Sequence, residues 1–196
     1  MSTFLTRFSQ DPVGNTLAVI VLLLLLAGLA QALLAFSTGD PPKRRPSPWW
    51  IAVLALAGAA VAFYMAYVEI NKVEAVCGPV GNCNSVQQSP YATLFGVLPV
   101  GVFGIIGYLA ILLVWALQTW GPASLRVPAA ITLWGMTFFG TLFSAYLTFL
   151  EPFVIGATCI WCISSALIAL ALLYLETPLM LSIWQPEDEG EEDISI

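Results

Sequence analysis

The stretch that decides the fold is Thr158-Cys-Ile-Trp-Cys-Ile-Ser-Ser165, a Cys-x-x-Cys pair at the start of a long apolar segment. Cys159 and Cys162 stand three residues apart, so in a helix both thiols lie on one face. In the first turn of a helix, unpaired N–H groups and the helix dipole favour a thiolate, which is the species that attacks disulfides. This stretch therefore predicts a redox-active cysteine pair at the end of a membrane helix.

The composition around this pair is that of an integral membrane protein. Of the 196 residues, 59% are hydrophobic and 9% are charged, whereas soluble domains carry about 25% charged residues. The chain has no histidine, which excludes histidine-based catalysis and histidine metal ligands. Half of the twelve acidic residues lie in the C-terminal tail, which we expect to be solvated.

Five apolar segments are long enough to cross a ~30 Å hydrocarbon core, which takes about 20 helical residues. The expected fold class is an all-α integral membrane protein, with a four-helix transmembrane bundle plus one extra N-terminal transmembrane helix. We divide the chain into a lead at 1–14, the extra helix at 15–36, a basic cytoplasmic linker at 37–48, the bundle at 49–176 and an acidic cytoplasmic tail at 177–196. Within the bundle we expect spans at 49–70, from Phe95 or Leu98 to 117, at 128–150 and at 159–175.

Proline and glycine mark two features of these spans. Pro128 is expected to open the fourth span, because proline suits the first position of a helix. Gly101, Gly104 and Gly107 recur every three residues in the third span. Such a small face allows a neighbouring helix to approach closely, and ordinary packing glycines are the alternative.

The basic residues predict the orientation in the membrane. Lys43, Arg44, Arg45 and Arg126 fall in the loops that join spans one to two and three to four. The positive-inside rule places these loops in the cytoplasm. Both cysteine pairs then face the opposite side, which in a bacterial inner membrane is the oxidising periplasm.

Three kinds of site compete for the four cysteines. Structural disulfides are one, although a Cys-x-x-Cys bridge closes almost no loop and gains little entropy. A zinc site built from all four thiols is another, and such sites are typical of small soluble modules. We favour thiol–disulfide exchange, for which Cys-x-x-Cys is the typical arrangement. A mobile outer loop with Cys77 and Cys83 suits a soluble partner, and a pair at the bilayer surface suits a lipid-dissolved quinone.

The loop Cys77-Gly-Pro-Val-Gly-Asn-Cys83, its continuation at 84–92, the Phe95-Gly96 pair and Cys159-Ile-Trp-Cys162 together resemble the vitamin K epoxide reductase family. Bacterial members of that family have two loop cysteines five residues apart, a Ser-x-Tyr-Ala and a Phe-Gly at the next helix. The resemblance covers about residues 49–176. It implies a four-helix bundle around a quinone pocket, with the Cys-x-x-Cys at its outer end.

The resemblance also implies a role for each cysteine. Cys162 meets the quinone, Cys159 is its exchange partner, Cys83 relays between the pairs, and Cys77 meets the partner protein. Ser89 and Phe95 are expected near the quinone by the same analogy. Trp161 and Ser165 are further candidates from their position, although a membrane-interface aromatic and a hydroxyl bonded to its own helix are the simpler interpretations.

The predicted function is that of a membrane thiol oxidoreductase that sustains disulfide formation outside the cytoplasm. Electrons would pass from a thioredoxin-like (DsbA-like) soluble protein, acting in trans, to ubiquinone, menaquinone or phylloquinone, with no metal and no nucleic acid involved. Vertebrate members have a tyrosine four residues after the Cys-x-x-Cys and an asparagine in the second bundle helix. Here Ala166 takes the tyrosine position and the third span has no asparagine, which favours plain quinones over the epoxide.

Two other classes of protein remain open from the sequence. A DsbB-type thiol oxidase also has four spans and two cysteine pairs, but its Cys-x-x-Cys comes first in the chain rather than last. A non-enzymatic membrane protein with structural disulfides is the second alternative.

Overall fold

The computed structural model describes residues 6–38, 47–78, 81–94 and 96–184. Five of its helices are long and apolar enough to cross a membrane. They are α2 (Pro12–Thr38), α3 (Trp49–Asn71), α5 (Val100–Trp120), α6 (Ala123–Leu150) and α7 (Ile160–Trp184). The prediction of an all-α membrane protein with five spans is confirmed.

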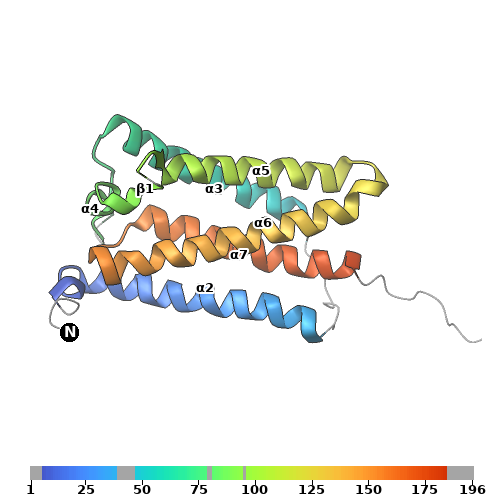
Figure 1. Cartoon of the computed structure of the whole chain (residues 1–196), viewed down its shortest axis with the longest axis horizontal. Helices are drawn as coiled ribbons and strands as arrows, with labels where there is room; N and C mark the ends of the chain where they lie inside the picture. Colours follow the sequence, from blue (N-terminus) through green and yellow to red (C-terminus); the bar gives the residue numbers. More distant parts are fainter. Residues whose placement is uncertain (1–5, 39–46, 79–80, 95, 185–196) are drawn as a thin grey trace, which may run out of the picture.

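Four of these helices form a bundle, and α2 packs against its outside. Helix α3 packs on α5 and α7, and α6 packs on the same two helices, so the four close into a ring. Helix α2 lies along α6 and α7, as Figure 1 shows. The expected four-plus-one arrangement is therefore what the structure has.

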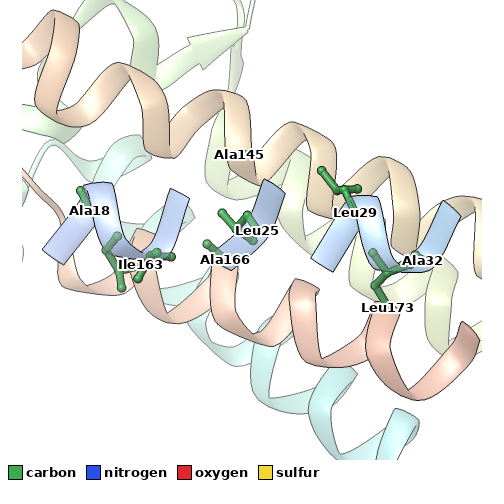
Figure 2. Close-up of a cluster of buried hydrophobic side chains, with 9 residues drawn as sticks. Ala18, Leu25, Leu29, Ala32, Ala145, Ile163, Ala166 and Leu173 are labelled. Carbon is green, nitrogen blue, oxygen red and sulfur yellow. The ribbon is translucent and has the colours of Figure 1, made fainter. Parts of the chain in front are cut away.

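The contact between α2 and the bundle is made by small and aliphatic side chains. Ala18, Leu25, Leu29 and Ala32 of α2 are buried against α6 and α7, as Figure 2 shows. Across from them lie Ile163, Ala166 and Leu173 of α7, with Ala145 of α6. Small residues let two helix backbones come close inside a membrane, where packing replaces the hydrophobic effect.

The short elements gather at one end of the bundle (Figure 1). They are α4 (Cys83–Gln87), the 3₁₀ turn η1 (Pro90–Ala92), the antiparallel pair β1 (Thr93–Leu94) and β2 (Leu98–Pro99), and the π-helical turn η2 (Glu151–Ile155). The first residues of α2 lie at the same end. This end therefore holds both cysteine pairs.

Several helix ends differ from the predicted ones. Helix α2 begins earlier, because the Asp11 side chain accepts a hydrogen bond from Gly14 N (3.0 Å) and so caps its first turn. Helix α5 begins at Val100, since β2 occupies the residues before it. The expectation that Pro128 opens a span is wrong: α6 starts at Ala123, where Leu125 N bonds to Pro122 O, and Pro128 lies inside it.

Helix α7 extends beyond the expected end near residue 175. Met180 and Leu181 are buried, so apolar packing continues past that point. Pro178 lies inside the helix, and the preceding Thr177 hydroxyl bonds to Leu173 O (2.8 Å) and accepts a hydrogen bond from Trp134 Nε1 (3.2 Å). The first part of the residues assigned to the tail is therefore helical.

The glycine face of α5 brings α3 close at one position. A Cβ on Gly101 would collide with the backbone of α3 at Ala66, and it would lie 2.9 Å from the carbonyl carbon of Met65. A Cβ on Gly104 would lie 3.1 Å from Ala62 Cβ, whereas one on Gly107 would meet open space. Of the two interpretations, close helix approach therefore applies at Gly101, whereas Gly107 has no such contact.

Candidate functional site

All four cysteines meet in one cluster, although Cys159 lies 76 positions after Cys83 in the chain. The side chains of Cys83 and Cys159 are fully buried, and those of Cys77 and Cys162 are half-buried. All four are free thiols in this structure. The cluster lies at the end of the bundle where α4 meets the start of α7 (Figure 1).

The thiols interact as neighbours in a defined order. The thiol of Cys83 interacts with that of Cys77 on one side and with that of Cys159 on the other. The thiol of Cys159 in turn interacts with that of Cys162. The order Cys77, Cys83, Cys159, Cys162 therefore joins the loop pair to the Cys-x-x-Cys.

The surroundings raise the pKa of three of these thiols. The interaction with Cys159, and then burial, raises the pKa of Cys83. Its interaction with Cys162, together with burial, raises the pKa of Cys159 against a lowering effect of Cys83. Burial, followed by the neighbouring Cys83, raises the pKa of Cys77. At Cys159, burial and the contact with Cys162 therefore oppose the helix dipole, which favours a thiolate.

A short capped helix brings Cys83 to the cluster. Cys83 is the first residue of α4, whose N-cap Asn82 accepts a hydrogen bond from Ser85 N through its side chain (3.2 Å). Asn82 N donates to Thr158 O (2.9 Å), which joins this helix to the segment before Cys159. Gly81 has a φ of 91°, and a Cβ there would collide with Thr158 O. Glycine is thus required for the two segments to meet.

An aromatic pair fixes the segment that carries Cys77. Trp161 Nε1 donates to Val76 O (2.9 Å), and Val76 N donates to the hydroxyl of Tyr64 (2.8 Å). The Tyr64 and Trp161 rings lie 4.7 Å apart, centroid to centroid. Ala75 N also donates to the Asn84 side chain (2.7 Å). Trp161 therefore joins the Cys-x-x-Cys helix to the segment that carries Cys77. It also lines the cavity beside Cys162.

Glu151 is a site residue that the sequence reasoning missed. Its side chain is 2% exposed, accepts a hydrogen bond from Cys159 N (3.4 Å) and interacts with the thiol of Cys162. Its backbone carbonyl accepts hydrogen bonds from Gly156 N (2.7 Å) and Ala157 N (3.3 Å). An acid inside an apolar span eight residues before the Cys-x-x-Cys was the available signal, because such residues are usually functional.

A cavity of about 370 Å³ opens among α3, α5, α6 and α7, next to Cys162. Most of its wall is apolar, and its polar groups come from Glu69, Gln87, Tyr108 and Ser165 among others. The Tyr108 hydroxyl lies 2.9 Å from Ser165 Oγ, and Gln87 Nε2 lies 4.0 Å from Cys162 Sγ. A few polar groups in an apolar cavity are typical of small-molecule sites.

Comparison with known protein families matches residues 49–177 to the vitamin K epoxide reductase family. The chain belongs to the vitamin K epoxide reductase family. This confirms the resemblance stated above and assigns the protein to the membrane thiol oxidoreductases of that family. The matched part begins with α3 and ends within α7, so α2 lies outside it.

The four expected quinone contacts, two from the family resemblance (Ser89 and Phe95) and two from their position (Trp161 and Ser165), lie in different places. Trp161 and Ser165 line the cavity. Ser89 is the N-cap of η1 and lies outside the cavity lining, and its buried hydroxyl has no hydrogen-bond partner among the described residues. Phe95 lies outside the residues that the structure describes. Ala166, which stands at the tyrosine position of vertebrate members, also lines the cavity.

A zinc site is one of the two alternatives to thiol exchange considered for the four cysteines. Within residues 6–38, 47–78, 81–94 and 96–184, no three His, Cys, Asp or Glu side chains are arranged to hold a metal ion. The thiols follow one another as neighbours in a series, which is an arrangement suited to exchange.

Proposed function

We propose that this protein passes electrons from a thioredoxin-like (DsbA-like) partner, through Cys77/Cys83 and then Cys159/Cys162, to a membrane quinone. It would thereby sustain disulfide formation outside the cytoplasm. One observation carries the proposal: the series of neighbouring thiols begins at the half-buried Cys77 and ends with Cys162 at a largely apolar cavity.

Each exchange in this series is a thiolate attack on a disulfide. The partner's dithiol reduces the Cys77–Cys83 disulfide, so the partner is oxidised and the loop pair gains two electrons and two protons. Cys83 then attacks Cys159 of the Cys159–Cys162 disulfide and releases Cys162. Cys77 attacks Cys83 in turn, which restores the loop disulfide and leaves Cys159 and Cys162 reduced.

The second half of the reaction takes place at the cavity. A quinone bound there accepts the two electrons and two protons that convert the Cys159/Cys162 dithiol to a disulfide. The Glu151 carboxyl group, which touches Cys162 and Cys159 N, is the group placed to take a thiol proton. Tyr108 and Ser165 offer hydroxyl groups that can orient a carbonyl oxygen. Ubiquinone, menaquinone and phylloquinone all have the flat carbonyl-bearing ring that such a cavity suits.

The proposed location is a bacterial inner membrane, with the cysteine cluster on the periplasmic face. The basic residues Lys43, Arg44, Arg45 and Arg126 support this orientation through the positive-inside rule. The acidic C-terminal tail then lies in the cytoplasm, because α7 runs away from the cysteine end (Figure 1).

Two measurements test the proposal together. The purified protein, mixed with a reduced DsbA-like partner, should reduce added quinone, and Cys162→Ser should abolish this. The second uses Cys77→Ser/Cys162→Ser, in which Cys83 and Cys159 can pair only with each other. A protease site between Gly121 and Pro122, in the turn between α5 and α6, places these two cysteines on different fragments.

The fragments should stay linked without reductant, because the two thiols are neighbours. They should separate in Cys77→Ser/Cys159→Ser, the matched control that leaves Cys83 with Cys162. Fragments that separate in both variants, with Cys77 and Cys83 bonded to each other in the native protein and no quinone reduction, would support structural disulfides instead.

A further inference from the structure

A buried asparagine on α2 contacts the segment that leads into Cys159. Asn15 is fully buried, although it is a polar residue in the first turn of an apolar helix. Its Nδ2 donates to Gly156 O (3.2 Å) and to Phe8 O (3.1 Å). Its Oδ1 accepts a hydrogen bond from the Thr158 hydroxyl (3.1 Å). The amide is therefore satisfied from both ends, and two of its three partners belong to residues 156–158.

The same short segment touches the helix of the other cysteine pair. Thr158 O accepts a hydrogen bond from Asn82 N (2.9 Å), and Asn82 is the N-cap of the helix that begins with Cys83. A continuous path thus runs from Asn15 through Thr158 to Asn82. Thr158 directly precedes Cys159, and Asn82 directly precedes Cys83. These are the two cysteines whose thiols interact.

The lead before α2 supports this segment at a second point. Arg7 Nη1 donates to Val154 O (2.8 Å), and Gly156 has a φ of 83°, where an added Cβ would lie 2.9 Å from Arg7 O. Glu151 holds the opposite side of the segment through Gly156 N and Ala157 N. Residues 156–158 are therefore held between η2 and the N-terminal helix.

We propose that Asn15 is a positioning residue for exchange between the two cysteine pairs. By holding Thr158 and Gly156, it sets the distance between Cys159 and Cys83. Helix α2 therefore contributes to the rate of thiol–disulfide exchange. A disulfide forms only when the two Cα atoms lie within about 7 Å with suitable side-chain directions. A small movement of this segment therefore changes the exchange rate strongly. The inference rests on the proposed function, and it concerns a helix that lies outside the family match.

The competing explanation is that Asn15 only helps α2 to dock on the bundle. That role predicts lower stability with an unchanged rate of disulfide formation. The positioning role predicts a slower rate in molecules that are still folded. The two explanations therefore differ in a quantity that can be measured on folded protein.

The experiment measures the initial rate at which Cys83 and Cys159 form a disulfide in the full-length Cys77→Ser/Cys162→Ser protein, with diamide as the oxidant. Thr158→Val should slow it about tenfold, the factor that corresponds to one lost hydrogen bond. Asn15→Ala, which also removes the bonds to Gly156 O and Phe8 O, should slow it at least as much. Thr158→Ser keeps the hydroxyl and should restore the rate. Combining Asn15→Ala with Thr158→Val should add little further slowing, because both remove the same contact.

The matched control is Thr16→Ala, one residue further along α2. The Thr16 side chain is exposed, and its hydroxyl bonds within its own helix to Pro12 O (2.6 Å), so this change should leave the rate unaltered. Two results would overturn the inference and leave the proposed function intact. One is the same rate of Cys83–Cys159 disulfide formation in all variants. The other is a rate lowered equally by Thr16→Ala and Thr158→Ser.

Two further results of this experiment have a clear interpretation. If Asn15→Ala does not fold, the comparison of Thr158→Val with Thr158→Ser decides the inference alone. If the parent protein with native Asn15 forms no Cys83–Cys159 disulfide, the exchange step itself fails, and both the proposed function and the positioning role are overturned.

Discussion

Replacing Gly101 by alanine should force α3 and α5 apart at the start of α5, where Gly101 lines the cavity. The added Cβ would collide with Ala66 N and lie 2.8 Å from Ala66 Cα, where ordinary contacts begin at 3.4 Å. These are backbone atoms, so no side-chain rotation can relieve the overlap. Helix α3 must therefore withdraw by several tenths of an ångström. The same movement would lengthen the hydrogen bond from Gly101 N to Glu69 Oε2, now 2.9 Å.

The expected loss of stability follows from two opposing terms. Overpacking of this kind costs about 1–3 kcal/mol. Alanine gains up to about 1 kcal/mol over glycine in a helix interior, and less in the first turn, where Gly101 lies. We therefore expect Gly101→Ala to lower the free energy of unfolding by about 1–2 kcal/mol. Gly107→Ala meets open space and should be neutral or stabilising by up to about 1 kcal/mol.

The assay is reversible unfolding in mixed micelles, with rising dodecyl sulfate and helicity as the signal. Gly104→Ala, whose Cβ would lie 3.1 Å from Ala62 Cβ, should fall between the other two variants. The order of stability should be Gly107→Ala, then Gly104→Ala, then Gly101→Ala. A Gly101→Ala protein as stable as Gly107→Ala would refute the close approach of α3 and α5.

Three more outcomes are expected. Because burial and Cys83 raise the pKa of Cys77, its thiolate fraction is lower than that of an ordinary cysteine at any given pH below that pKa. Its alkylation rate by iodoacetamide should therefore still climb above pH ~10, where a free thiol has nearly levelled off; a plateau at the pH of a free thiol would contradict this. Glu151→Gln should slow quinone reduction about tenfold or more while the Cys83–Cys159 disulfide still forms at the native rate in the two-cysteine protein, and an unchanged quinone rate would remove Glu151 from the mechanism. With Ala166 at the cavity, the protein should reduce plain quinones but act poorly on vitamin K epoxide in a dithiol-driven assay, so comparable rates on both substrates would count against that expectation.

The spans could be predicted from the sequence because membrane helices are local features. A long apolar run with few charges identifies a span whatever its neighbours are. Helix ends were less predictable, since Pro128 resembles a helix start and only the chain before it reveals an earlier one. At the other end of the bundle, α7 continues because its later residues find buried partners, which composition cannot show.

The cysteines could also be found from their spacing, but their supporting residues could not. Asn15 lies 144 residues before Cys159 in the chain, and only the packing of α2 on α7 brings the two near each other. The chemical state of Cys159 depends in the same way on distant neighbours, because the thiols around it and its burial set its pKa. Local patterns predict which residues react, whereas tertiary contacts decide how they are held.

The cavity beside Cys162 also reaches the outside of the bundle. Its wall includes Ile106 of α5 and Phe139 of α6, which are 55% and 56% exposed and lie on helices long and apolar enough to cross a membrane. A ligand can therefore enter sideways from the bilayer without crossing water. The concentration that governs turnover is then the mole fraction of ligand in the lipid, not its amount per litre. Adding inert lipid at constant total ligand should lower the rate by surface dilution, so Michaelis constants for such a site are meaningful only per mole of lipid.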